Sequence, residues 1–133
     1  MNTRIIMIAS AVYLGICGLG LTFLPEEIAE HLDIGKNQSA TLSLQILGSL
    51  YLGFAMLNWM TKNNVIGGIY SKPLVVGNLS HFLISSLTLL KIVGKYEGTQ
   101  FSIILLLTII YCVFTLCFAY LFMTSPGKRS ATD

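Results

Sequence analysis

The chain has 133 residues, of which 54% are hydrophobic and only 11% are charged, and its mean hydropathy is +0.75. Soluble domains carry about 25% charged residues, so this composition excludes an ordinary soluble domain and indicates an integral membrane protein. The formal net charge of +2 comes without a run of Lys and Arg interleaved with aromatic residues, which argues against a nucleic-acid partner.

Four apolar segments stand out, over residues 5–24, 40–60, 74–93 and 101–123. Each is about 20 residues long, and a helix of that length crosses the ~30 Å hydrocarbon core of a bilayer. The predicted fold class is therefore all-α, an integral membrane four-helix bundle. Because the spans leave no room for a soluble domain beside them, we predict one transmembrane domain over residues 1–133.

The first segment begins after Arg4 and ends before Pro25. Its apolar run is longer than the core of a secretory signal peptide, and no small-residue cleavage site follows it before Pro25, so we interpret it as a retained helix. One face of this helix carries small or polar side chains at steps of 3, 4 and 3 residues: Ser10, Tyr13, Cys17 and Gly20.

A short amphipathic helix is predicted at the membrane interface after the first span, over residues 25–33. Pro25 suits a first helical turn, and acidic residues crowd the N-terminal end, where the helix dipole favours them. Ile28 and Leu32 are four residues apart on one face, and we expect them to dip into the interface.

No metal or cofactor is expected. Glu27 and His31 are four residues apart, but a zinc site needs at least three protein ligands, and this connection contains no cysteine. A solvated face is therefore the favoured interpretation. Haem held by two histidines is disfavoured, because His31 and His81 fall on opposite sides of the predicted topology.

The second span presents small and polar residues on one broad face, which favours close helix packing. These residues are Gln45, Gly48, Tyr51, Ala55 and Asn58. The glycine-punctuated stretch within it, LGSLYLGFA over residues 47–55, resembles small four-span bacterial membrane proteins of the DoxX-like kind. The resemblance covers the hydropathy layout and this stretch. It implies a four-helix bundle of unsettled activity and carries over no functional residue.

The third span holds the most informative pattern of the chain, a narrow polar stripe at steps of 3, 4 and 3 residues: Asn78, His81, Ser85 and Thr88. Hydrogen-bonding side chains are costly against lipid tails, so we expect the stripe to face other helices or a cavity. His81 is either a functional group, as a general base, proton relay or ligand contact, or a neutral imidazole that holds helices together. Asn78 would orient that ring, bind a headgroup or link helices.

The fourth span carries a similar stripe of small or polar residues: Thr108, Cys112, Thr115 and Ala119, with Tyr111 at its margin. If all four stripes converge, the bundle interior holds a polar pocket in the cytoplasmic half of the bilayer. The predicted ligand-binding residues of this pocket are His81, Asn78, Asn58, Tyr13, Tyr111 and Ser85.

Orientation follows from the basic residues. With four spans, one side carries Arg4, Lys62, Lys72, Lys128 and Arg129, and the other carries Lys36, Lys91 and Lys95. The positive-inside rule then predicts that both termini are cytoplasmic. We expect a bacterial inner membrane because the chain is small and simple.

The favoured function is a non-enzymatic membrane protein that binds a lipid-like or small amphipathic ligand in this pocket. One alternative is an accessory or assembly subunit that packs against a larger membrane partner or forms a homo-oligomer. The other is an intramembrane enzyme acting on a lipid or isoprenoid, with His81 as acid/base and Asn78 or Tyr13 as its orienting partner. The absence of Asp and Glu from all four spans argues against carboxylate-driven transport, and enzymatic activity itself stays open.

Overall fold

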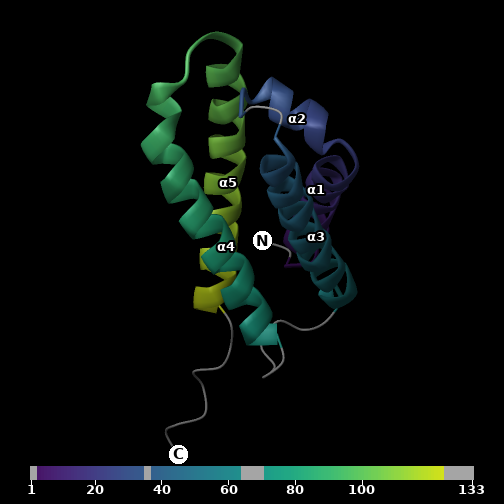
Figure 1. Cartoon of the computed structure of the whole chain (residues 1–133). Helices are drawn as coiled ribbons and strands as arrows, with labels where there is room; N and C mark the ends of the chain where they lie inside the picture. The colour runs from purple at the N-terminus through teal and green to yellow at the C-terminus, as the bar shows by residue number, and fades with distance from the viewer. Residues whose placement is uncertain (1–2, 35–36, 64–70, 125–133) are drawn as a thin grey trace, which may run out of the picture. The chain divides into compact units, whose positions relative to one another are not determined.

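The computed structural model of the chain describes residues 3–34, 37–63 and 71–124 (Figure 1). Within these residues the chain forms helices joined by short connections and contains no strand. The helices are α1 (Thr3–Phe23), α2 (Pro25–His31), α3 (Gln38–Thr61), α4 (Ser71–Ile92), the 3-10 turn η1 (Val93–Lys95) and α5 (Gly98–Thr124).

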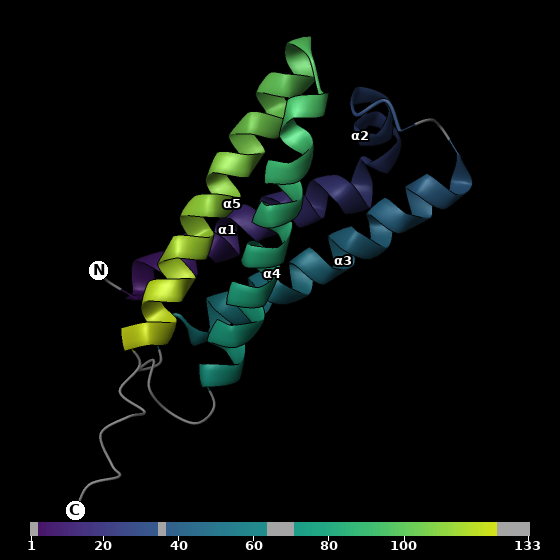
Figure 2. The ribbon, with the colours of Figure 1, turned by 90° about the vertical axis from the view of Figure 1, so that its left-hand side faces the viewer.

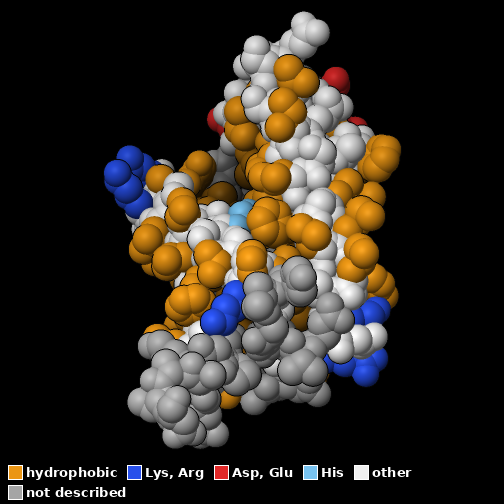
Figure 3. All heavy atoms as spheres, turned by 90° about the horizontal axis from the view of Figure 1, so that it is seen from below, with side chains coloured by type: hydrophobic (Ala, Val, Ile, Leu, Met, Phe, Trp, Pro, Cys, Tyr) orange, Lys and Arg blue, Asp and Glu red, His pale blue; other side chains and the backbone are white. Residues whose placement is uncertain are grey.

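Helices α1, α3, α4 and α5 are long and apolar enough to cross a membrane. Many of their large apolar side chains are exposed, and hydrophobic side chains cover much of the face shown in Figure 3. A surface of this kind is suited to lipid rather than to water. The predicted class is confirmed: the protein is a small all-α integral membrane protein with four spanning helices and a short helix after the first.

The helix starts lie slightly earlier than the apolar runs predicted. Helices α4 and α5 begin at Ser71 and Gly98, before the expected starts at 74 and 101, because a helix can begin with polar residues that a hydropathy window leaves out. The start of α3 has a specific cause. The Asn37 side chain accepts a hydrogen bond from the Ala40 N–H at 2.7 Å, which satisfies a donor that the first helical turn leaves unpaired.

The chain divides into two compact units. The first unit comprises Met1–Ile6 and Asn63–Asp133 and contains α4, η1 and α5. The second comprises Met7–Lys62 and contains most of α1 with α2 and α3. The expectation of one domain over residues 1–133 stays a prediction.

In the first unit, α4 and α5 lie side by side and antiparallel, joined through η1 (Figures 1 and 2). Their core is aromatic. Phe82 of α4 is fully buried and stacks on Phe114 and Phe118 of α5, with ring centroids 4.8 Å and 5.6 Å apart. Gly98 has a φ of +59°, a left-handed conformation that glycine adopts without steric cost, and this allows the chain to turn into α5.

In the second unit, α1 and α3 approach closely where two glycines meet. A Cβ atom added at Gly48 would lie 2.9 Å from the backbone oxygen of Gly18, so only glycine fits there without a shift. The short helix α2 packs against α3 and ends at His31. Asp33 follows with a φ of 54°, and the Ile34 N–H donates to the Ala29 carbonyl at 3.0 Å, which closes the helix end.

The orientation prediction rests in part on Lys36, Lys128 and Arg129, and these three residues lie outside the described residues.

Candidate functional site

The predicted site residues fall into two sets. Asn78, His81 and Ser85 on α4 and Tyr111 on α5 belong to the first unit. Tyr13 on α1 and Asn58 on α3 belong to the second unit. The prediction that all six line one pocket joins residues of both units and stays a prediction.

The buried face of α4 differs from the predicted stripe. Asn78 is fully buried and His81 and Ser85 are half-buried, but Thr88 is exposed, so the expectation that Thr88 faces inward is wrong. The reason is Phe82, whose ring contacts three aromatic rings of α5. These contacts turn the Phe82 face of α4 toward α5. Thr88 tolerates its position because its hydroxyl donates to the Ile84 carbonyl at 2.9 Å.

His81 lies against Tyr111 across the α4–α5 contact. Their ring centroids are 5.8 Å apart and tilted by 56°, and Phe82 lies edge-on to both rings. Tyr111 is buried, and the Nε2 atom of His81 is buried as well. The aromatic neighbours therefore hold the imidazole and the phenol in fixed positions within a membrane span.

Asn78 lies one helical turn before His81 and Phe82 on α4. Its Nδ2 atom donates to the carbonyl of Leu74 at 3.0 Å, a bond within its own helix. One turn further along, the hydroxyls of Ser86 and Thr115 meet at 3.4 Å between α4 and α5. Ser86 is buried and was not among the predicted site residues. Ser86 lies four residues after Phe82, on the same face of α4. It would have been predicted if Phe82, rather than His81, had been taken as the centre of the contact between α4 and α5.

The chemistry available to His81, Tyr111 and Asn78 is hydrogen bonding. An imidazole and a phenol each donate and accept, and an amide does both through separate atoms. No Asp or Glu occurs in any of the four spans, so these groups have no intramembrane carboxylate to act with. In the part of the chain that the structure describes, no three His, Cys, Asp or Glu side chains gather closely enough to hold a metal ion.

Asn58 in the second unit forms a bond between helices. Its Nδ2 atom donates to the hydroxyl oxygen of Ser10 on α1 at 3.0 Å, and the Ser10 hydroxyl donates in turn to the Met7 carbonyl at 3.1 Å. Asn58 and Ser10 are fully buried. This geometry is that of a polar link between spans. Tyr13 is half-buried on α1, and its hydroxyl oxygen is buried.

The broad face predicted for the second span is largely correct. Gly48, Ala55 and Asn58 are buried and Tyr51 is half-buried, whereas Gln45 is exposed. Gln45 lies nearer the start of α3, within two turns of Gln38, where a polar amide can reach the membrane surface.

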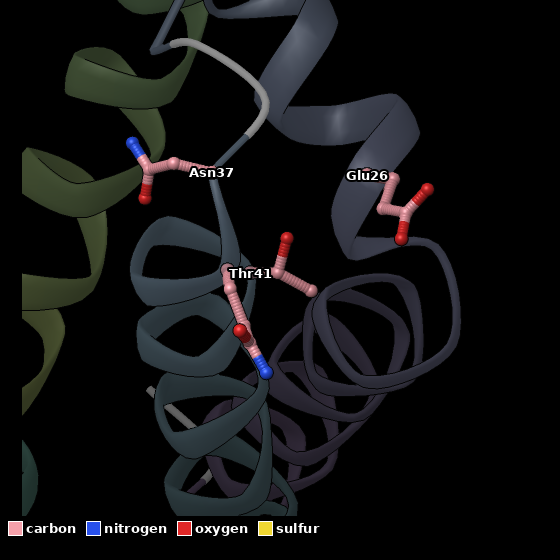
Figure 4. A pocket seen from close by; sticks show the side chains of 4 residues that line it. Glu26, Asn37 and Thr41 are labelled. Atoms are coloured by element: carbon pink, nitrogen blue, oxygen red, sulfur yellow. The ribbon is translucent and has the colours of Figure 1, made fainter.

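Two hollows in the second unit were not anticipated from the sequence. One, of about 270 Å³, lies where α2 approaches the start of α3 and is lined by Glu26, Asn37, Gln38 and Thr41 (Figure 4). Its Asn37 side chain is turned away from Glu26 and serves as the cap of α3. All four lining side chains are polar, and Glu26 is exposed.

The second hollow is an apolar groove of about 240 Å³ between α1 and α3. It is lined by Ala11, Val12, Ala55, Met56 and Trp59. The sequence does not single out Ala11 and Ala55, because both spans carry several other small residues, among them Ala9, Gly15, Ala40 and Gly53. What the sequence lacks is the rotation of each helix, which decides that these two alanines meet.

Comparisons of the chain with models of protein families, with curated proteins and with solved structures find no match, and the resemblance to DoxX-like proteins stays a prediction.

Proposed function

We propose that this membrane protein is not an enzyme and that it binds a lipid-like or small amphipathic molecule through His81 and Tyr111. The observation that carries the proposal is the placement of these two side chains against each other across α4 and α5, 5.8 Å apart between ring centroids. Asn78 and Ser85, before and after His81 on α4, complete the polar group.

Polar side chains inside a span are costly, and those that persist commonly belong to a binding or transport site. Here the polar atoms lie beside Phe82, which is fully enclosed, and Phe82 in turn stacks on Phe114, which is half-buried. A ligand with a hydroxyl or carbonyl head and an apolar body matches both parts: the head hydrogen-bonds to His81 or Tyr111, and the body packs on the accessible part of Phe114.

The location within the cell belongs to the same proposal. The basic residues favour an orientation with both termini in the cytoplasm, and a bacterial inner membrane is the proposed compartment. In that orientation, Asn78 and His81 lie in the cytoplasmic half of α4, which starts on that side.

The test uses substitutions that remove polar atoms but keep the aromatic rings. His81→Phe and Tyr111→Phe preserve ring stacking with Phe82, so we expect the folded protein to keep its thermal stability. Mass spectrometry of the small molecules that co-purify with the protein is the measurement. Loss of one hydrogen bond of about 1 kcal/mol predicts about fivefold less retained ligand in each variant. Thr88→Val, an exposed hydroxyl on the same helix, is the matched control and leaves retention unchanged.

Three outcomes contradict the proposal. Equal retention by all variants removes His81 and Tyr111 from any binding site and favours an accessory subunit. Unfolding of His81→Phe assigns the imidazole a structural role. If a retained lipid is instead converted to a new product by the native protein and not by His81→Phe, the protein is an enzyme.

A further inference from the structure

The groove between α1 and α3 opens outward from the second unit. Its floor is made by Ala11 and Ala55, which are buried, and its sides by Val12, Met56 and Trp59, whose side chains are all about half exposed or more. These residues lie in helices long and apolar enough to span a membrane, and the exposed sides of the groove are apolar. Two small residues thus leave a recess in an apolar surface of the second unit, and such a recess suits an acyl chain.

A positive charge stands at one end of this recess. The Lys62 ammonium lies 3.1 Å from the centroid of the Trp59 ring, a cation–π contact. Lys62 caps the C-terminal end of α3, so it is at the membrane face where that helix ends. At 1.5 Å per residue, Ala55 lies about 10 Å deeper in the bilayer than Lys62. The recess therefore runs from the headgroup level into the acyl region.

From this geometry we propose that the groove holds one acyl chain of an anionic phospholipid, and that Lys62 binds its phosphate. Trp59 fixes the ammonium at the mouth of the groove, which lowers the conformational cost of holding a long Lys side chain in one place. The indole N–H of Trp59 adds a hydrogen-bond donor at the depth of the lipid ester groups. The site is an apolar slot with a cation at its outer end. An anionic lipid matches it, because its acyl chain fits the slot and its phosphate lies at the level of the cation.

A second copy of this chain is a poorer occupant. The acidic residues of the connections after the first and third spans lie on the other side of the predicted topology from Lys62, so another copy brings none of those carboxylates to this cation. A zwitterionic lipid fills the slot equally well but gains less from the cation. The proposal is independent of the function assigned to His81, since every residue of the groove belongs to the second unit and none to the His81 group.

Native mass spectrometry of the purified full chain tests the site. The protein is incubated with phosphatidylglycerol or phosphatidylcholine of identical acyl chains in the same detergent, and bound lipid is counted. One interfacial Lys near an anionic headgroup predicts about fivefold preference for phosphatidylglycerol. Lys62→Gln abolishes the preference, and Trp59→Ala lowers retention of both lipids. The readout is the ratio of the two lipids, which differ only in the headgroup, so it reports on the cation at Lys62 rather than on the amount of lipid bound elsewhere.

The controls use residues of matched type outside the groove. Lys95→Gln removes an exposed cation in η1, at the opposite membrane face, and Met60→Ala removes an exposed apolar side chain next to Trp59 that does not line the groove. Both retain the native preference. Equal binding of the two lipids by the native protein overturns the proposal. So does an unchanged preference in Lys62→Gln, or the same loss in Lys95→Gln, because the effect is then one of overall charge.

Discussion

In the second unit α1 and α3 meet through glycine, whereas in the first unit aromatic rings fill the space between α4 and α5. At Gly48 an added Cβ would be 2.9 Å from the Gly18 oxygen, while Phe82 stacks on Phe114 at 4.8 Å between centroids. In a bilayer, helices gain no hydrophobic energy by leaving lipid, so both contacts depend on close packing. The comparison teaches that one short chain uses backbone proximity in one pair of spans and large interlocking side chains in the other.

The first prediction concerns the aromatic contact between α4 and α5, whose loss should have the largest effect on stability. Phe82→Ala removes the ring that contacts Tyr111, Phe114 and Phe118, and the free energy of unfolding should fall by about 3 kcal/mol because a large cavity remains. Unfolding by added denaturing detergent, followed by circular dichroism, measures the change. Phe122→Ala on α5 is the control, since Phe122 is exposed, and it should cost little. Equal losses in both variants would show that α4 and α5 do not rely on this stack.

The second prediction attacks the glycine contact. Gly48→Ala places a methyl group against the backbone of Gly18 and Thr22, and overpacking of this kind costs about 2 kcal/mol. Gly53→Ala on the same helix is its counterpart, because nothing lies within 4 Å of the added Cβ atom. That variant should be neutral or more stable by up to about 1 kcal/mol, from the better helix propensity of Ala. A Gly48→Ala protein as stable as the native one would rule out the close approach.

The third prediction compares the polar links of the two pairs and carries the smallest effects. A double-mutant cycle of Ser10→Ala and Asn58→Ala should give a coupling of about 1 kcal/mol, because the bond is 3.0 Å long and fully buried. A cycle of Ser86→Ala and Thr115→Val should give no more than about 0.5 kcal/mol. Its hydroxyls are 3.4 Å apart, and the Thr115 hydroxyl has a closer acceptor, the Tyr111 carbonyl at 2.8 Å. A larger coupling in the second cycle would reverse the ranking.

The fold was predictable because its determinants are local. The sequence shows four apolar runs of spanning length without any knowledge of packing. It also shows Pro25 followed by acidic residues, which marks the start of a short helix. The structure has helices at all these places. The helix starts were less accurate. The Asn37 cap of α3 depends on a side-chain bond that hydropathy does not register.

The candidate site was predictable only in part, because it depends on helix rotation. Judged by polarity alone, Thr88 should face inward as His81 does. However, the Thr88 hydroxyl donates to a carbonyl of its own helix, so the side chain can face lipid. Phe82, which the polar stripe skips, determines which side of α4 faces α5. The groove beside Trp59 was missed for a related reason: Ala11 and Ala55 form a recess only once α1 and α3 have met at their glycines.

The serines and threonines of α3 bear on how this segment enters a membrane in the first place. The hydroxyls of Ser43, Ser49 and Thr61 donate to carbonyls three or four residues earlier in their own helix, at 2.7–2.8 Å. A nascent segment that forms these bonds presents fewer unsatisfied hydroxyl groups to the translocon than its amino-acid sequence suggests. Transfer scales taken from isolated side-chain analogues should therefore underestimate the readiness with which α3 partitions into lipid.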